Sequence, residues 1–188
     1  MGLLTILRKQ RLRDKEIRVL VLGLDNAGKT TIVKRLLGQD VREVSPTLGF
    51  SIESLTRDDY TVNIWDVGGQ RSLRPFWHNY FEKTDSLVWV VDATAPDRLQ
   101  DCAIELQNTL NQDRLQGAGL LIFVNKLDVI PQDEQSQVLQ TVEKNLNLNA
   151  LGLHNYKVLG CSAYSGLNID EGFQWVIDEV KSRLFLLA

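Results

Sequence analysis

The chain is poor in cysteine and contains no long apolar segment. Its 188 residues include two cysteines, Cys102 and Cys161, too few for a disulfide framework, and both lie in apolar stretches. We therefore expect two reduced thiols in the core of a cytoplasmic protein. No run of about 18 apolar residues occurs, so no segment qualifies as a membrane-spanning helix. With 44% apolar residues and no linker or internal repeat, the chain is long enough to build a full core.

Positive charge is scarce outside the N-terminal region. The net charge is −3, but residues 1–20 carry six basic and two acidic side chains, so the remaining residues carry −7. An acidic body argues against a nucleic-acid partner, because binding to phosphates needs a basic surface. We expect a basic, amphipathic arm over residues 1–15 and one folded domain over residues 16–188.

Apolar runs typical of strands alternate with helical patterns along the chain. The segment Arg57-Asp58-Asp59 separates two of these runs and predicts a hairpin. The alternation predicts an α/β fold with a mostly parallel sheet, one antiparallel strand, and helices on both faces. Ligands of such sheets bind at the carboxyl ends of the strands. We expect strands over residues 17–22, 48–56, 60–65, 87–91, 120–124 and 156–160, and helices over residues 29–37, 98–114, 133–146 and 170–187.

A phosphate-binding motif follows the first expected strand. The segment from Gly23 to Thr30 fits G-x-x-x-x-G-K-[ST] and lies between a strand and a helix, which is the context this motif requires. The plain alternative is a glycine-rich turn with an exposed lysine, but a chance match in this length is roughly one in 200. Glycines let the backbone curl so that N–H groups and a helix N-terminus face a phosphate. The candidate nucleotide-binding residues here are Gly23, Asp25, Asn26, Ala27, Gly28, Lys29, Thr30 and Thr31.

Two further segments indicate which base is bound. Asn125-Lys126-Leu127-Asp128 follows the strand at 120–124, and Cys161-Ser162-Ala163 follows the strand at 156–160. The Asp128 carboxylate would accept hydrogen bonds from guanine N1–H and its exocyclic amine, which adenine lacks. Asn125 would brace the loop and the Lys126 stem would pack on the base. Small residues at Ser162 and Ala163 would let backbone N–H groups approach guanine O6.

The hairpin's second strand leads into Trp65-Asp66-Val67-Gly68-Gly69-Gln70. In phosphoryl transfer, Mg²⁺ is held by the loop hydroxyl, here Thr30, and by an acidic residue, here Asp66 through a water. Gly69 would present its N–H to the terminal phosphate, and Gln70 would orient the attacking water as the catalytic residue. Thr47 is the candidate for a second hydroxyl on Mg²⁺. Taken alone, Gly68-Gly69 is an ordinary glycine turn and Thr47 an ordinary surface threonine. The proposed roles of these residues therefore depend on the other motifs.

These motifs together resemble the ADP-ribosylation-factor family of small GTPases over essentially the whole chain. The matching segments are the phosphate loop, Pro46–Phe50 and Trp65–Gln70. The resemblance implies a six-stranded α/β GTPase fold, binding of GTP or GDP with Mg²⁺, and a hairpin that slides between two registers. It implies that the N-terminal helix packs on the GDP form and is released in the GTP form. It also implies an aromatic, effector-binding triad of Phe50, Trp65 and Tyr80, each of which has a core aromatic as its plain alternative.

The resemblance also implies partners and a cellular role. Because no arginine is evident in a position to act in cis, we expect slow hydrolysis that depends on an activating protein. The implied partners are tubulin-folding cofactor D and a prenyl-binding carrier protein, with a cytoplasmic location and an association with microtubule-organising structures. Alternatives within the family are ciliary cargo release and membrane traffic through coats or tethers. A metabolic P-loop enzyme, such as a nucleotide kinase, would need an arginine-rich lid that this chain lacks.

The N-terminal arm has three competing interpretations. Myristoylation at Gly2 requires Ser or Thr at position 6, but Ile6 stands there and Thr5 lies one place early, so this signal is poor. The apolar residues of Leu3–Leu7 would fill a groove on a partner protein, cover the domain itself, or lie on an anionic membrane. About five apolar residues without a lipid bind membranes weakly, so we expect membrane contact to be weak or transient.

Overall fold

The computed structural model describes residues 14–148 and 155–185 of the chain. The expected arm over residues 1–15 therefore lies outside them except for Asp14 and Lys15. A six-stranded sheet forms the centre, in the order β2-β3-β1-β4-β5-β6. Only β2 and β3 pair antiparallel, and the other neighbours are parallel. The strands are β1 (Glu16–Gly23), β2 (Phe50–Arg57), β3 (Tyr60–Val67), β4 (Ser86–Asp92), β5 (Gly119–Asn125) and β6 (Tyr156–Gly160).

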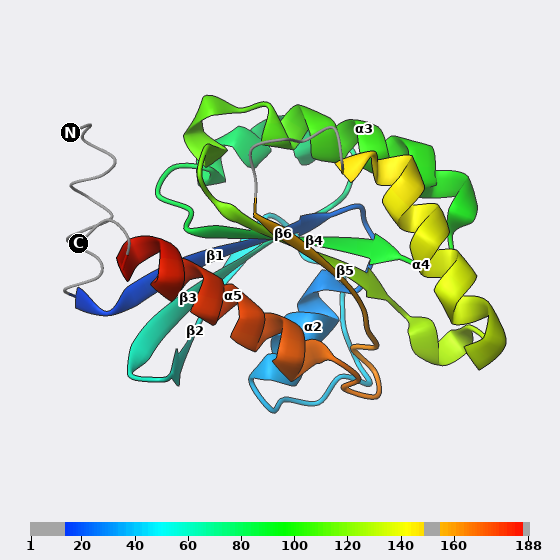
Figure 1. Cartoon of the computed structure of the whole chain (residues 1–188), viewed down its shortest axis with the longest axis horizontal. Helices are drawn as coiled ribbons and strands as arrows, with labels where there is room; N and C mark the ends of the chain where they lie inside the picture. Colours follow the sequence, from blue (N-terminus) through cyan, green and yellow to red (C-terminus); the bar gives the residue numbers. More distant parts are fainter. Residues whose placement is uncertain (1–13, 149–154, 186–188) are drawn as a thin grey trace.

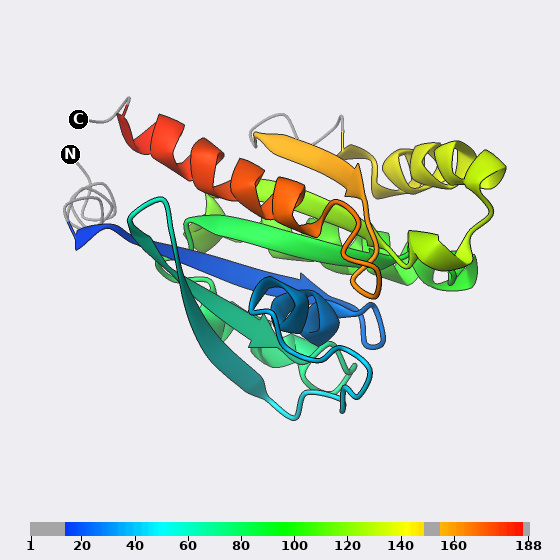
Figure 2. The same ribbon diagram turned by 90° about the horizontal axis from the view of Figure 1, so that it is seen from below.

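Helices cover both faces of this sheet, as Figures 1 and 2 show. α3 and α4 lie on one face, and α2 and α5 lie on the other. The prediction of a mostly parallel six-stranded sheet with helices on both faces is confirmed. No helix among the described residues is long and apolar enough to cross a membrane. The helices are α2 (Lys29–Leu36), α3 (Leu99–Leu110), α4 (Gln132–Leu146) and α5 (Ile169–Phe185), and the short 3-10 helices are η1 (Arg74–Tyr80), η2 (Pro96–Arg98), η3 (Asp113–Leu115) and η4 (Leu127–Val129).

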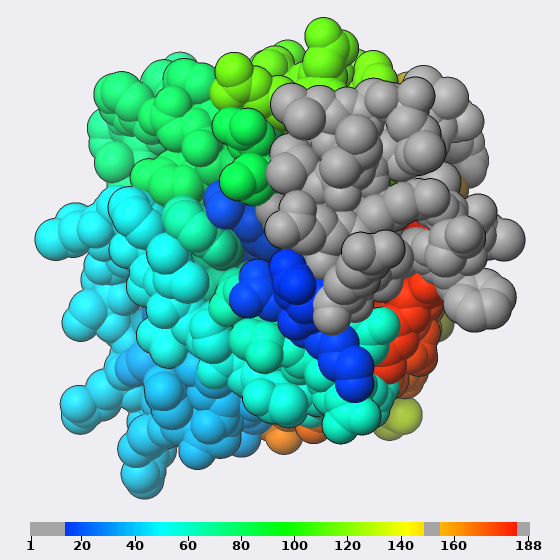
Figure 3. Space-filling model, turned by 90° about the vertical axis from the view of Figure 1, so that its left-hand side faces the viewer, coloured from blue at the N-terminus to red at the C-terminus, as the bar shows by residue number. Residues whose placement is uncertain are grey.

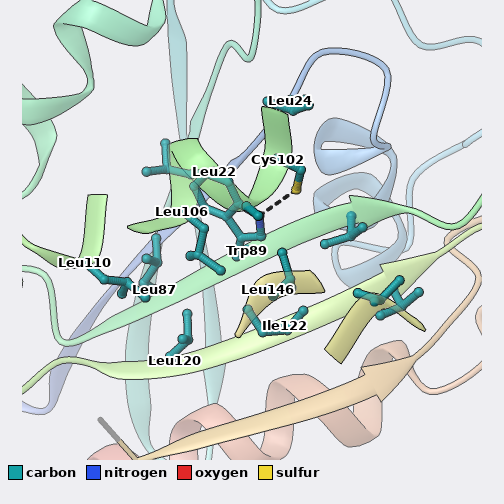
Figure 4. Packing of buried hydrophobic residues seen from close by; sticks show 14 of the residues in the cluster. Leu22, Leu24, Leu87, Trp89, Cys102, Leu106, Leu110, Leu120, Ile122 and Leu146 are labelled. Carbon is teal, nitrogen blue, oxygen red and sulfur yellow. Dashed lines mark hydrogen bonds between the residues drawn. The ribbon is translucent and has the colours of Figure 1, made fainter. Parts of the chain in front are cut away.

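The central strands are apolar on both sides because helices bury both faces. Leu22 and Trp89 point into the core under α3 and α4, while Val21 and Val88 point into the core under α2 and α5. Trp89 is fully buried, and its Nε1 donates to the Cys102 Sγ at 3.2 Å, as Figure 4 shows. Both cysteines are buried and free, as the sequence predicts.

The β2–β3 hairpin closes with a two-residue turn. Asp58 and Asp59 both adopt left-handed conformations, which is the geometry of the hairpin turn that matches strand twist. The Asp58 carboxylate accepts from Lys181 Nζ at 2.7 Å and from Gln174 Nε2 at 2.8 Å, both on α5. In Figure 3 the turquoise surface of the hairpin meets the red surface of α5. The edge hairpin is thus tied to a helix.

Three expectations about the elements need correction. The helix expected over residues 98–114 ends at Leu110, because the chain turns at Asn111 and Gln112 so that Leu115 in η3 is buried. The strand expected from Leu48 begins at Phe50, because Leu48 is 90% exposed and Gly49 has φ +90°. The sequence reading contained no helix over η1, whose seven residues begin with a proline-containing turn and show no α-helical pattern.

Candidate nucleotide-binding site

The phosphate loop connects β1 to α2 at the carboxyl edge of the sheet. Gly23 has φ +144°, and a Cβ there would lie 2.3 Å from the Val90 carbonyl oxygen of β4. Gly28 has φ +95°, and a Cβ there would lie 2.3 Å from Asn125 Nδ2. Both positions therefore require glycine. α2 begins at Lys29 without a side-chain cap or an acidic residue in its first turn, which leaves its N-terminal N–H groups suited to an anion.

A cavity of about 310 Å³ lies over this loop. Its walls come from the phosphate loop, from the segment before β2, and from the segment after β3. The cavity brings together eight of the residues that sequence analysis assigns to phosphate or metal binding, and also the catalytic candidate Gln70. The lining residues are Asp25, Asn26, Gly28, Lys29, Thr30, Thr31, Val44, Ser45, Pro46, Thr47, Gly68, Gly69 and Gln70. Gly23, Ala27 and Asp66 do not line the cavity, but Asp66 accepts a hydrogen bond from the lining residue Thr30.

Lys29 is buried within the loop. Its Nζ donates to the Leu24 carbonyl oxygen at 2.8 Å. Burial lowers the pKa of Lys29 to about 8, and the carboxylates of Asp66 and Asp25 act in the opposite direction. A phosphate in the cavity would favour the charged form of this amine. The loop therefore holds a buried lysine. The free-energy cost of burying its charge would be offset by an anionic ligand.

Three oxygen-bearing side chains from separate elements meet at one point. Thr30 Oγ1 donates to Asp66 Oδ2 at 2.6 Å and lies 2.7 Å from Thr47 Oγ1. Asp66 is fully buried, its Oδ1 has no hydrogen-bond partner, and burial raises its pKa. Hydroxyl and carboxylate oxygens are the ligands that Mg²⁺ prefers, together with phosphate oxygens and water. This donor set, with one buried carboxylate oxygen unsatisfied, fits Mg²⁺.

The segment after β3 packs directly on the phosphate loop. The Asp25 N–H donates to the Gly69 carbonyl at 3.2 Å, and Trp77 Nε1 donates to the Gly68 carbonyl at 3.0 Å. A Cβ on Gly69 would lie 2.4 Å from the Gly23 carbonyl oxygen, so only glycine permits this approach. The next side chain, Gln70, lines the cavity, and its Oε1 is buried with no partner.

The residues expected to recognise the base lie beside the phosphate loop, and Asn125 is bonded to it. Asn125 is buried, and its Nδ2 donates to the Ala27 carbonyl at 2.9 Å. Its Oδ1 accepts from the Ala163 N–H at 2.9 Å. Ser162 Oγ donates to the exposed Asp128 carboxylate at 2.6 Å. The two loops expected to recognise guanine are therefore connected to each other and to the phosphate loop.

The three aromatic residues expected to contact effectors form one cluster on the surface. The rings of Phe50 and Trp65 stack with centroids 5.7 Å apart, and Tyr80 lies 5.2 Å from Phe50 and 6.1 Å from Trp65. Phe50 is 47% exposed, and Trp65 and Tyr80 are half-buried. Arg18 places its guanidinium 3.8 Å from the Trp65 ring centroid. The group is thus a partly exposed triad.

Sequence analysis missed three charged residues that support the site. Arg74 of η1 and Arg98 of η2 both contact the Asp25 carboxylate, at 3.5 and 2.6 Å. Asp92, the last residue of β4, accepts from Lys126 Nζ at 2.6 Å and thereby holds the lysine expected on the base. The only local signal was for Asp92, which stands at a strand's carboxyl end. The arginines lie far from Asp25 in sequence.

A phosphate loop between a parallel strand and a helix, with an Asn-Lys-x-Asp loop at the same sheet edge, defines a P-loop guanine-nucleotide-binding protein. A model of the ADP-ribosylation factor family matches residues 3–180. The chain therefore belongs to the ADP-ribosylation factor family of small GTPases, which confirms the resemblance seen in the sequence. Like these proteins, it is a regulatory switch that binds GTP or GDP with Mg²⁺ and hydrolyses GTP.

Several relatives match over essentially the whole chain. The ADP-ribosylation factor-like protein 2 of Dictyostelium discoideum is 44% identical over 187 residues, and that of Arabidopsis thaliana is 47% identical over 188 residues, each covering 100% of both chains. The ADP-ribosylation factor-like protein 3 of Chlamydomonas reinhardtii is 41% identical over 96% of this chain and 100% of its own. The Arl6 BBS3 small GTPase of Trypanosoma brucei, solved with the nucleotide analogue GppNp, superposes with a TM-score of 0.77 at 25% identity, covering 89% of this chain and 98% of that one.

Proposed function

We propose that this GTPase is a cytosolic switch and that its GTP form is the one that binds effectors. The observation that carries this proposal is the meeting of Thr47 with Thr30 and Asp66. Thr47 comes from the segment before β2, so its arrival at the metal-binding position links nucleotide state to the position of the hairpin. A ligand that binds this arrangement more tightly shifts the population of the protein toward the hairpin position that goes with it.

In this proposal each site residue has a distinct task. The phosphate-loop amides and Lys29 bind the phosphates, and Thr30, Thr47 and Asp66 hold Mg²⁺, Asp66 through a water. Asp128 recognises guanine, with Asn125, Lys126, Ser162 and Ala163 shaping its pocket. Gly69 donates its N–H to the terminal phosphate, and Gln70 orients the attacking water. The bound Mg²⁺ neutralises charge that develops between the phosphates.

We propose that intrinsic hydrolysis is slow and that an activating protein supplies an arginine. The two arginines that contact Asp25 of the phosphate loop support this proposal, because both guanidinium groups already have protein partners. Arg98 donates to the Asp25 carboxylate and carbonyl, and Arg74 bonds Asp101 and Glu105 of α3. Neither guanidinium is free to serve the terminal phosphate in cis while these bonds persist.

Single-turnover hydrolysis of GTP tests the catalytic assignment. We expect Gln70→Leu to retain GTP with unchanged affinity and to lose assisted turnover, because the water loses its orienting amide. Gln140→Leu, at an exposed glutamine on α4, is the matched control and should hydrolyse like the parent. Normal assisted turnover in Gln70→Leu would remove Gln70 from its role. Parent hydrolysis faster than about one per second without a partner would overturn the proposal of slow chemistry.

We propose tubulin-folding cofactor D and a prenyl-binding carrier as the partners of the GTP form, in the cytoplasm and at microtubule-organising structures. Full-length relatives named ADP-ribosylation factor-like protein 2, at 44% and 47% identity, support this assignment over the role of ciliary cargo release, which would fit a closer likeness to ADP-ribosylation factor-like protein 3, here 41% identical. The exposed Phe50–Trp65–Tyr80 triad is the proposed contact surface. In the same proposal, residues 1–15 form a separable arm on a GTPase domain of residues 16–188.

Binding of the two purified partners to GDP-loaded and GTP-analogue-loaded protein tests this assignment. We expect binding to the analogue form that Phe50→Ala weakens at least tenfold, since truncating an exposed interface aromatic removes a binding anchor. Tyr164→Ala, at an aromatic residue more exposed than Phe50 and outside the triad, is the control. Binding that is equal in both nucleotide states would contradict the switch assignment. Capture of coats or tethers, or flotation of the unmodified GTP form with liposomes, would favour the membrane-traffic alternative.

A further inference from the structure

We propose that Arg74 is a positioning residue for GTP hydrolysis, which holds the backbone next to Gln70 from an anchor on α3. The proposal rests on the proposed function of Gln70 as the residue that orients water. Arg74 belongs to η1, four residues after Gln70, and no motif in the sequence points to it. Its side chain bonds the segment after β3, approaches the phosphate loop, and bonds α3.

Arg74 is buried, with 8% of the residue exposed, and its guanidinium contacts four oxygen atoms. Nε donates to the Gly69 carbonyl at 3.1 Å. Nη1 donates to Asp101 Oδ2 at 2.9 Å and to Glu105 Oε1 at 3.1 Å. Nη2 lies 3.5 Å from Asp25 Oδ1. One planar, five-donor group therefore serves three elements at once, which a lysine ammonium cannot do with the same geometry.

The anchor for this arginine is rigid. Asp101 and Glu105 stand one turn apart on α3, so both carboxylates lie on the same side of the helix. On an adjacent face of the helix, Cys102 and Leu106 are buried in the core. A helix held in this way keeps the carboxylates in place, and they in turn fix the orientation of the guanidinium.

The bond to Gly69 is what connects this anchor to the chemistry. The Gly69 carbonyl accepts from Arg74 Nε and from the Asp25 N–H, so two donors fix the plane of the Gly69–Gln70 peptide. Trp77 Nε1 fixes the preceding carbonyl, that of Gly68. The orientation of a peptide plane sets where the next side chain begins. Loss of one donor therefore misplaces Gln70 even though the phosphates and Mg²⁺ remain bound.

The test compares full-length Arg74→Lys with Arg71→Lys, the same substitution at an exposed arginine three residues away. We expect Arg74→Lys to slow single-turnover hydrolysis of γ-labelled GTP about tenfold, since one lost positional contact corresponds to a factor of this order. Affinities for GTP and GDP should stay within about twofold, because Arg74 is not among the residues proposed to bind nucleotide. Arg71→Lys should match the parent in every measurement.

Removal of the anchor provides an independent variant. Asp101→Asn with Glu105→Gln keeps the shape of both side chains and leaves the phosphate loop untouched. We expect a smaller loss of hydrolysis, about threefold, with nucleotide affinity again unchanged. A rate within twofold of the parent in both Arg74→Lys and the anchor variant would overturn the proposal. So would a loss of rate matched by equal losses of nucleotide affinity and melting temperature, since that pattern marks a purely structural role.

Gln70→Leu, measured in parallel, separates the two possible failures. If Gln70→Leu retains the parent rate, the catalytic assignment of Gln70 fails, and the proposal for Arg74 fails with it. If Gln70→Leu loses hydrolysis while Arg74→Lys keeps the parent rate, the proposed function stands and only the positioning role is refuted. If both lose hydrolysis with nucleotide affinity retained, both are supported.

Discussion

Asn125 joins the phosphate end of the site to the base end, and its removal should weaken both. Its side chain bonds two buried backbone groups, donating to the Ala27 carbonyl at 2.9 Å and accepting from the Ala163 N–H at 2.9 Å. In Asn125→Ala, each of these backbone groups loses its partner at a cost of about 1–3 kcal/mol, so the free energy of unfolding should fall by about 2–6 kcal/mol. That is a large fraction of the ~5–15 kcal/mol typical of a domain.

Two assays measure this loss. Urea unfolding measures the free energy of unfolding. It is carried out at saturating GDP, because the bound ligand adds stability and keeps the variant folded before urea is added. Release of a fluorescent GDP reports the site directly, and we expect it to accelerate at least tenfold, since the loop proposed to hold the phosphates loses its bond to Asn125. Asn79→Ala, at an exposed position of η1, should change the free energy of unfolding by less than about 0.5 kcal/mol. The reasoning is refuted if Asn125→Ala matches this control in both assays.

Three further predictions concern the loop, its lysine and the thiols. Gly28→Ala should lower GTP affinity at least tenfold, because its Cβ would lie 2.3 Å from a side-chain nitrogen, while Gly38→Ala, with nothing within 4 Å, should not; equal affinities would contradict this. Burial lowers the pKa of Lys29 to about 8 from 10.5, so between these pH values the unfolded chain binds more protons than the nucleotide-free protein. The free energy of unfolding should therefore rise with pH there relative to Lys29→Met, and a constant difference would refute it. Burial raises the pKa of Cys102 to about 11 and also raises that of Cys161, so a thiol reagent at neutral pH should label both only upon unfolding; rapid native labelling would contradict the burial.

Local sequence was sufficient to identify the fold and most of the candidate site. The strands that lie in the middle of the sheet, such as β4 and β5, are continuous apolar runs because both of their faces are covered. Each candidate motif follows a strand directly. In a parallel sheet the carboxyl ends of neighbouring strands lie together, so chain order alone predicts that these motifs meet. Gly23 and Gly28 are needed for the backbone geometry of the loop, and the sequence motif already requires glycine at both positions.

The tertiary structure decided what supports the site. Arg74 reaches Asp101 and Glu105 across 27 and 31 residues of chain, and Arg98 reaches Asp25 across 73. Such contacts follow from how η1, η2 and α3 pack at the sheet edge, and no hydrophobic period or local motif encodes them. Thr47 is similar, because it lies in a polar segment without regular structure, and only packing places its hydroxyl 2.7 Å from that of Thr30. The sequence by itself thus determined the fold and the residues proposed to face the nucleotide, whereas only the tertiary structure decided which side chains hold those residues in place.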